Sequence, residues 1–218
     1  MATTTIENYV KEIFFAEQES PGNPVPMGTI AKALKVVPGT ATTMVKSMER
    51  SKLLEYKPRI GVTLSGKGRT LAIRMIRRHR LIEVFLVNVL KLDWDEIHED
   101  AEELEHVVSD RILEKIDKLC GYPEFDPHGD PIPSADGTFK PVKHKSLMEC
   151  PTGRQLAIQR VLDQEASFLK FAMNSGLTPG ATIQVVERNP IAEAITVLLD
   201  KGRQLSLGAK VAEKILVA

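Results

Sequence analysis

The sequence has few cysteines, few aromatic side chains and no long apolar run. Its two cysteines, Cys120 and Cys150, form no CxxC pair, so we expect neither a disulfide framework nor a thiolate zinc site. No stretch approaches the roughly 18 consecutive apolar residues of a membrane helix, and no signal peptide opens the chain. These absences lead us to expect a cytoplasmic protein that has no membrane partner.

The motifs of several enzyme classes are also missing. The sequence contains no P-loop, no GxGxxG fingerprint and no Ser-His-Asp constellation. HEDAE at residues 98–102 is not the HExxH of zinc proteases, because Glu102 stands where the second histidine is required. Glu103 and His106 match the ExxH of dimetal enzymes, but those proteins need a second such motif. We therefore expect no enzyme and no small-molecule substrate, with a dimetal enzyme as the least favoured alternative.

What the chain does have is an uneven distribution of charge. It is 43% hydrophobic, which is enough for a sizeable core, and its formal net charge is zero. Residues 1–80 contain 14 Lys and Arg against 6 Asp and Glu, residues 81–128 contain 4 against 14, and residues 129–218 contain 11 against 9. A basic block before an acidic block suggests one anionic and one cationic partner, unless both blocks are ordinary solvated surfaces.

The basic block predicts three helices. Thr4 and Glu7 have capping-box spacing, and they open an amphipathic helix that ends at the SPGNP turn of residues 20–24. A short helix is expected at 29–34, and a second one from Pro38, which suits a first helical turn, to about residue 51. The two strand-like runs LLEY and GVTL follow, joined by the turn KPRIG. This order predicts a winged helix-turn-helix.

The expected recognition helix buries Ala41, Val45 and Met48, so its threonines face elsewhere. Short hydroxyl side chains near a helix N-terminus can approach base edges and phosphates without steric cost. We therefore expect double-stranded DNA to contact the threonines and lysine of this helix and the basic wing turn, namely Thr40, Thr42, Thr43, Lys46, Lys57 and Arg59. A small α+β domain without a nucleic acid partner is the alternative.

A long helix is expected next, capped by Ser65 at its start and ending near Leu90. Its stretch LIEVFLVNVL is more apolar than one amphipathic face requires. Burial against a second copy of the chain explains this, and a buried helix within one chain is the alternative. His79 and Glu83 lie four residues apart on this helix and therefore share one face.

The acidic block contains HEDAEELEH at residues 98–106. At about 100° per residue, an apolar stripe runs down this helix, and charged side chains crowd the flank beside it. The flank carries His98, Glu102, Glu105 and His106. Half-buried carboxylates and imidazoles need a neutralising cation, and a donor set without thiolate suits manganese, iron or zinc. A solvated acidic face is the alternative.

Several stretches together resemble one known family. RRHRLIEVFL, HEDAEELEHVVSD and PHGDPIP, with MERSKLLEY and TLSGKGRTLA, are similar to the diphtheria toxin repressor family, and especially to its manganese-responsive three-domain members. The resemblance implies a homodimeric, metal-dependent repressor of metal-uptake genes that binds a pseudo-palindromic operator. An iron- or zinc-responsive regulator of the same family is one alternative. A winged-helix regulator with another effector and a structural metal is the other.

The resemblance also implies metal ligands. One set is His79, Glu83, His98, Glu102, Glu105 and His106. Glu102 stands where iron-responsive relatives have cysteine, which favours Mn²⁺ over Fe²⁺ or Zn²⁺. A second site of streptococcal-type relatives implies Asp126, His128 and Asp163 together with Glu83, and here Asp126 stands in place of a cysteine.

The first helix departs from the family pattern at two positions. Asn8 stands where manganese regulators have aspartate, and Lys11 stands where some two-metal members have glutamate. An amide oxygen can still be a ligand, so Asn8 remains a candidate. Either the first site is weaker or different, or the second site carries more of the signal.

The C-terminal third predicts strands. Residues 123–151 are rich in Pro, Gly and Asp and are expected to be an irregular connector. A strand-like start and a short helix follow, and then the alternating runs GLTPGATIQVVER, AITVLLD and KVAEKILVA predict a small β-barrel. This resembles the SH3-like domain of the family and of ferrous-transport accessory proteins. Too few aromatic residues are present for a proline-recognition groove.

The predicted fold is mostly α with a small β portion. We expect a winged helix-turn-helix domain at 1–72, a helical metal-binding and dimerisation domain at 73–142, and an SH3-like, FeoA-like domain at 143–218.

Overall fold

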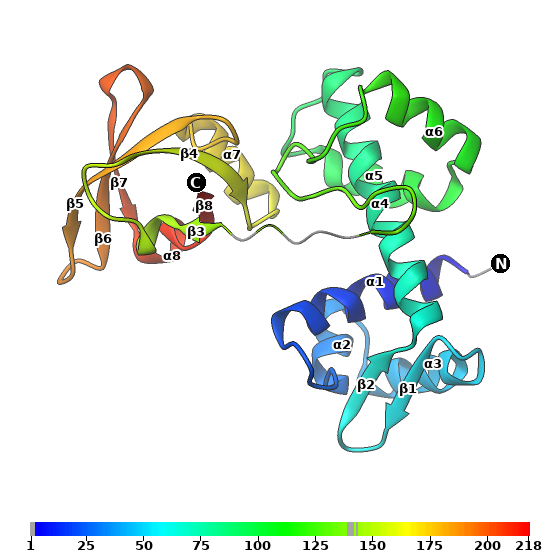
Figure 1. The fold of residues 1–218 in the computed structure, drawn as a ribbon. Helices are drawn as coiled ribbons and strands as arrows, with labels where there is room; N and C mark the ends of the chain where they lie inside the picture. Colours follow the sequence, from blue (N-terminus) through cyan, green and yellow to red (C-terminus); the bar gives the residue numbers. More distant parts are fainter. Residues whose placement is uncertain (1–2, 139–141, 143) are drawn as a thin grey trace. The chain divides into compact units, whose positions relative to one another are not determined.

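The computed structural model describes residues 3–138, 142 and 144–218, and the chain divides into two compact units. The first comprises residues 1–79 with 133–139, and the second comprises residues 80–132 with 140–218. Helix α4 (Gly66–Asn88) is unbroken where the division falls (Figure 1). Among the described residues, no helix combines the length and the apolar character that crossing a membrane requires. The three domain boundaries expected from the sequence stay a prediction.

The first unit contains the predicted winged helix-turn-helix. Its elements before α4 are α1 (Thr4–Glu19), α2 (Met27–Ala33), α3 (Pro38–Arg50), β1 (Leu54–Lys57) and β2 (Gly61–Leu64). The N-cap of α1 is Thr3, whose side chain accepts a hydrogen bond from the Ile6 N–H. The prediction of Thr4 as the cap was therefore wrong by one residue, because Thr4 is already helical.

The wing and the recognition helix share one core. β1 and β2 pair antiparallel, and Val25 forms a bridge with Val62 of β2. The side chain of Ser65 accepts the Gly68 N–H at 3.1 Å, as expected for the cap of α4. The predicted core face of α3, formed by Ala41, Val45 and Met48, is fully buried.

The second unit begins with helices packed around α4. α5 (Ile97–Val107) and α6 (Asp110–Leu119) follow α4 in the chain. The core of this part contains Leu81, Ile82 and Leu86 of α4, with Ile97 and Ala101 of α5 and Leu113 of α6. Half-buried Leu104 and Val108 pack against that core, which confirms the predicted apolar stripe. Sequence analysis did not identify α6, although Ser109 caps it.

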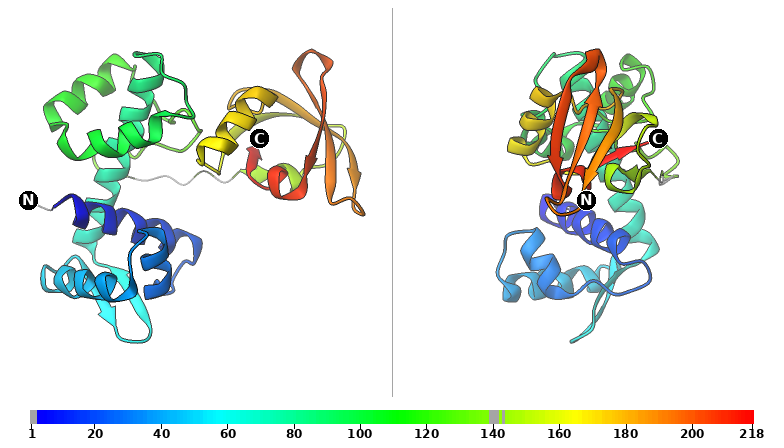
Figure 2. Two further views of the ribbon diagram at one scale, coloured as in Figure 1. Left: turned by 180° about the vertical axis from the view of Figure 1, so that it is seen from behind. Right: turned by 90° about the vertical axis from the view of Figure 1, so that its left-hand side faces the viewer.

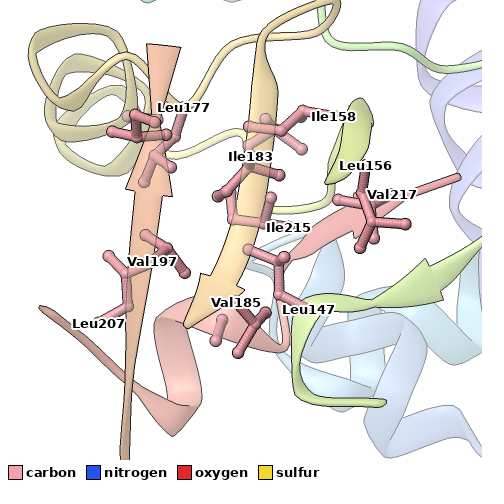
Figure 3. Packing of buried hydrophobic residues seen from close by; sticks show 14 of the residues in the cluster. Leu147, Leu156, Ile158, Leu177, Ile183, Val185, Val197, Leu207, Ile215 and Val217 are labelled. Carbon is pink, nitrogen blue, oxygen red and sulfur yellow. The ribbon is translucent and has the colours of Figure 1, made fainter. Parts of the chain in front are cut away.

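The C-terminal part of this unit is a six-stranded antiparallel sheet in the order β3-β8-β4-β5-β6-β7 (Figure 2). Its elements are β3 (Lys145–Ser146), η1 (Leu147–Glu149), β4 (Gln155–Val161), α7 (Ala166–Ser175), β5 (Thr182–Asn189), β6 (Ala194–Leu199), η2 (Asp200–Gly202), β7 (Gln204–Gly208), α8 (Ala209–Ala212) and β8 (Ile215–Val217). In Figure 3, Ile158, Ile183 and Val197 come from three adjacent strands and share one buried core.

Two details of this sheet differ from the prediction. The edge strands β3 and β7 are not paired with each other within the described residues, so the expected small barrel is an open SH3-like sheet. The run KVAEKILVA was predicted as a strand, but its first half forms α8 and only its end forms β8. Short apolar runs fit either structure, and packing in the folded chain decides between them.

Candidate metal centre and nucleic-acid interface

The predicted DNA-contacting residues lie on α3 and the wing of the first unit. Five of the six are exposed and Thr42 is half-buried, the full set being Thr40, Thr42, Thr43, Lys46, Lys57 and Arg59. A groove of about 490 Å³ is lined by Thr43, Lys46, Glu49, Arg50, Tyr56 and Pro58. Arg50, which was not among the predicted residues, lies four residues after Lys46 and hence on the same helix face.

Two threonine hydroxyls on α3 are bonded to their own helix. Thr42 Oγ1 donates to the Pro38 carbonyl at 2.8 Å, and Thr43 Oγ1 donates to the Gly39 carbonyl at 3.0 Å. These bonds fix the hydroxyl hydrogens and leave the oxygens as acceptors. At the wing, Arg59 has φ of +67°, a conformation that costs a side-chain-bearing residue roughly 1–2 kcal/mol.

The metal-ligand candidates of the acidic block lie on α4 and α5. Glu83 of α4 is fully buried, and its Oε1 is 3.6 Å from Nδ1 of His98 on α5. His98 Nε2 lies 4.0 Å from Oε1 of Glu102, one turn further along α5. His79 precedes Glu83 by one turn of the unbroken α4.

The remaining predicted ligands of α5, Glu105 and His106, lie on the side of the helix that is turned away from solvent. Glu105 is fully buried and its Oε1 is 3.5 Å from His106 Nε2. Three other acidic side chains of α5, Glu99, Asp100 and Glu103, are exposed. The helix therefore holds some carboxylates out of water and leaves others in it, which a uniformly solvated acidic face would not do.

A second ligand group lies wholly within the second unit. Ligand atoms of Glu83, Asp126 and His128 all lie within 4.8 Å of one another, and all three residues are buried. His128 Nε2 is 3.1 Å from the Trp94 carbonyl, and the Trp94 and His128 rings are stacked with their centroids 5.3 Å apart. A carbonyl only accepts, so Nε2 carries the proton and Nδ1 presents its lone pair towards Glu83 Oε2, at 3.9 Å.

The electrostatics of this group favour a bound cation. Burial raises the pKa of the Asp126 carboxyl well above its usual value, and the charges of Asp130 and Glu83 raise this pKa further, while Arg80 lowers it. Within the described residues, neither His128 Nδ1 nor Asp126 Oδ2 has a hydrogen-bond partner. A divalent cation would supply both the missing charge and the missing contacts. The donor set of carboxylate and imidazole therefore fits such an ion.

Two predicted ligands are placed differently. Asp163 is not in the group of Glu83, Asp126 and His128: its Oδ2 pairs with the Lys214 ammonium, and its Oδ1 accepts the Glu165 N–H at 3.0 Å. Asn8 lies on α1 of the first unit, and its Oδ1 is buried without a hydrogen-bond partner in the described part of the chain. An orphaned amide oxygen is consistent with a ligand, and both assignments stay predictions.

Comparison with known protein families covers nearly the whole chain. The N-terminal DNA-binding domain of iron-dependent repressors matches residues 1–62, and the metal-binding and dimerisation domain of iron-dependent repressors matches residues 65–134. The FeoA domain matches residues 145–218.

Individual proteins agree with these matches. The iron-dependent repressor IdeR of Mycobacterium leprae is 30% identical over 207 residues, covering 89% of this chain and 88% of that protein. A manganese-dependent transcriptional repressor solved in complex with manganese is 36% identical, with a TM-score of 0.87 over 98% of this chain and 99% of that one. The repressor ScaR with bound Cd²⁺ is 32% identical, with a TM-score of 0.79 over 98% of each chain. These relatives are repressors rather than enzymes. The chain belongs to the iron-dependent repressor family, the family of the diphtheria toxin repressor, and is a metal-dependent, DNA-binding transcriptional repressor.

Proposed function

We propose that the protein is a manganese-responsive repressor of metal-uptake genes that acts in the cytoplasm as a homodimer on a pseudo-palindromic operator. The observation that carries the choice of metal is the chemistry of the ligand candidates. They offer carboxylate oxygen and imidazole nitrogen, and among the described residues neither cysteine belongs to a candidate ligand group. Such donors suit Mn²⁺ better than they suit ions that prefer thiolate, with Fe²⁺ and Zn²⁺ as the competing ions.

Two sets of residues would hold the ions. The first is Glu102, Glu105 and His106, with Asn8 as the ligand predicted on α1. His79 and His98 are further ligands that the family resemblance implies. The second is Glu83, Asp126 and His128, with Asp163 as a predicted addition that would have to leave Lys214. A bound divalent cation supplies the positive charge that lets several buried carboxylates remain ionised together.

Operator binding would use α3 and the wing. Thr40, Thr43 and Lys46 are exposed on α3, and Lys57 and Arg59 are exposed on the wing. Two such modules in a homodimer favour half-sites separated by one or more turns of the duplex. Because basic side chains displace counterions from phosphates, operator affinity should fall steeply as salt rises.

The second unit offers apolar surface for the homodimer. Val107, Ile112, Leu119 and Tyr122 are between 54% and 76% exposed, on or beside α5 and α6. Large exposed apolar side chains are frequent in protein interfaces. This surface supports the dimeric state implied by the dimerisation domain that the chain matches.

The test compares operator affinity in chelator and in Mn²⁺, using the region upstream of the protein's own gene. An ion can shift the DNA-binding equilibrium only by binding one conformer better, so affinity should rise when Mn²⁺ is added. Fe²⁺ and Zn²⁺ at matched free concentrations test the choice of metal. Equal affinity in chelator and in Mn²⁺ would refute the manganese response.

A matched pair of variants on α5 separates ligand loss from loss of charge. Glu105→Gln changes a buried carboxylate, whereas Glu103→Gln changes an exposed one on the same helix. Glu105→Gln should abolish most of the Mn²⁺ response, and Glu103→Gln should leave it intact. Equal responses in the two variants would mean that the buried face of α5 does not hold the ion.

A further inference from the structure

The five residues Asp126–Asp130, here called the DPHGD loop, have two sets of partners within the second unit. Asp126 and His128 point ligand atoms at Glu83 of α4. The same loop is also fastened to β4 of the C-terminal sheet. A contact that fixes the position of the loop therefore fixes the ligand group relative to the sheet.

Backbone contacts form the first fastening. The His128 carbonyl accepts the Val161 N–H of β4 at 2.9 Å. Gly129 has φ of +88°, and a Cβ at this position would lie 1.9 Å from the Gln159 carbonyl oxygen. The loop and β4 thus lie in backbone-to-backbone contact, which only glycine permits at this point.

The carboxylate of Asp130 forms the second fastening. Asp130 is buried, and its Oδ1 lies 3.0 Å from the Arg80 guanidinium of α4 and 2.5 Å from the Arg160 guanidinium of β4. Its Oδ2 accepts the side-chain amide of Gln164, just after β4, at 3.0 Å. One side chain thereby joins the helix that carries Glu83 to the C-terminal sheet.

Hydrogen bonds within the DPHGD loop connect the ligand group to the contacts with β4. Asp126 Oδ1 accepts the N–H groups of both His128 and Asp130 at 2.9 Å, and the Asp126 N–H donates to the Asp130 carbonyl at 2.9 Å. Arg80 Nε lies 3.6 Å from Asp126 Oδ2, so one guanidinium faces both aspartates. A displacement of Asp130 must therefore shift Asp126 and His128 as well.

We propose that Asp130 is a positioning residue that couples the ligand group of Glu83, Asp126 and His128 to the C-terminal sheet. Cation binding at this group and attachment of the sheet to α4 then strengthen each other, because coupling between two binding equilibria is reciprocal. The inference rests on the proposed function in one respect: the group must bind a divalent cation.

The chain has a built-in reporter for the test. Trp94 is its only tryptophan, and it stacks on His128. Quenching of Trp94 fluorescence by paramagnetic Mn²⁺ therefore reports a cation bound beside the Trp94–His128 stack. Hydrogen exchange of the Val161 amide measures attachment of the sheet.

The variant is Asp130→Asn, which preserves shape and removes the charge. Its matched control is Asp200→Asn, an exposed carboxylate of the same unit that accepts one backbone N–H. Groups outside the ligand set that orient metal ligands typically contribute ten-fold or more to metal affinity. We expect Asp130→Asn to weaken Mn²⁺ quenching of Trp94 about ten-fold and Asp200→Asn to leave it unchanged. Mn²⁺ should slow Val161 exchange in the parent chain and in the control, and much less in Asp130→Asn.

A milder variant covers the case in which Asp130→Asn fails to fold. Gln164→Ala removes a single hydrogen bond to Asp130, and it should shift Mn²⁺ affinity and Val161 exchange in the same direction by about three-fold, the loss of roughly one net hydrogen bond.

Two results would overturn the coupling alone. One is unchanged Mn²⁺ affinity in both loop variants. The other is Val161 exchange that rises equally with and without Mn²⁺, because a purely structural clamp would behave in that way. By contrast, a parent chain in which Mn²⁺ affects neither Trp94 nor operator affinity would refute the proposed function itself.

Discussion

Replacement of Gly129 by alanine tests the close contact between the DPHGD loop and β4. Two costs combine at this site. An L-residue at φ of +88° loses roughly 1–2 kcal/mol. The new Cβ would also lie 1.9 Å from the Gln159 carbonyl oxygen, so the strand must move and the adjacent bond from Val161 to His128 is strained or lost. Losing that bond and repacking the contact adds about 2 kcal/mol, for a total of roughly 3–4 kcal/mol.

The chain offers a control that isolates the contact from the dihedral angle. Gly180 has φ of +89° and nothing within 4 Å of its would-be Cβ, so Gly180→Ala carries the dihedral cost alone. A difference of about 2 kcal/mol corresponds to an opening equilibrium about 30-fold larger. Native-state hydrogen exchange at the Val161 amide should show that ratio between the two variants. Equal exchange in Gly129→Ala and Gly180→Ala would refute the reasoning, because the contact with β4 would then contribute nothing.

Three further predictions concern the ligands and the operator. Asn8→Asp should raise Mn²⁺ affinity by restoring an anionic ligand, as measured by calorimetric titration; an unchanged affinity would remove Asn8 from the ligand set. Lys46→Ala should weaken binding to all DNA sequences alike and reduce the slope of log affinity against log salt by about one per protomer, and an unaltered slope would exclude a phosphate contact. Because the pKa of Asp126 is raised in the folded, metal-free chain, its carboxyl stays protonated above its usual pKa of 3.8, and Mn²⁺ must displace that proton. Quenching of Trp94 at fixed Mn²⁺ should therefore increase as pH rises through the raised pKa, and a pH-independent response would contradict the assignment. Without metal, the folded state holds this proton more tightly than the unfolded chain does. The contribution of this proton to the free energy of unfolding is therefore complete below pH 3.8 and is lost as pH rises towards the raised pKa.

Local signals in the sequence were sufficient for much of the fold. The helical spacing of Ala41, Val45 and Met48 identified the buried face of α3, and all three side chains are fully buried. The same reasoning divided α5 correctly into buried and exposed faces. Such patterns work because a residue's position around a helix depends only on its neighbours in the chain. α6 also has a local signal, the capping Ser109 shortly before apolar residues.

The second ligand group could not be derived from local pattern. Glu83 lies more than forty residues before His128, and nothing in either stretch states that the two meet. Only the family resemblance brought them together before the structure was known. Asp163 was predicted as a ligand from the same resemblance, but its side chain pairs with Lys214. Lys214 lies 51 residues away in the sequence, so no spacing rule could anticipate the ion pair. The part played by Asp130 likewise depends on Arg80 and Arg160, which belong to different elements.

The hydroxyl bonds of α3 affect which bases the proposed DNA contact would favour. While Thr42 and Thr43 donate to the carbonyls of Pro38 and Gly39, their oxygens can only accept hydrogen bonds. In the major groove, the groups that donate are the exocyclic amino groups of adenine and cytosine, whereas guanine presents acceptors there. The threonine methyl groups can in addition pack against the methyl group of thymine. At the proposed DNA contact, this part of α3 would therefore favour an adenine or cytosine amino group with a thymine methyl group beside it, whereas guanine would place its acceptors against the threonine oxygens.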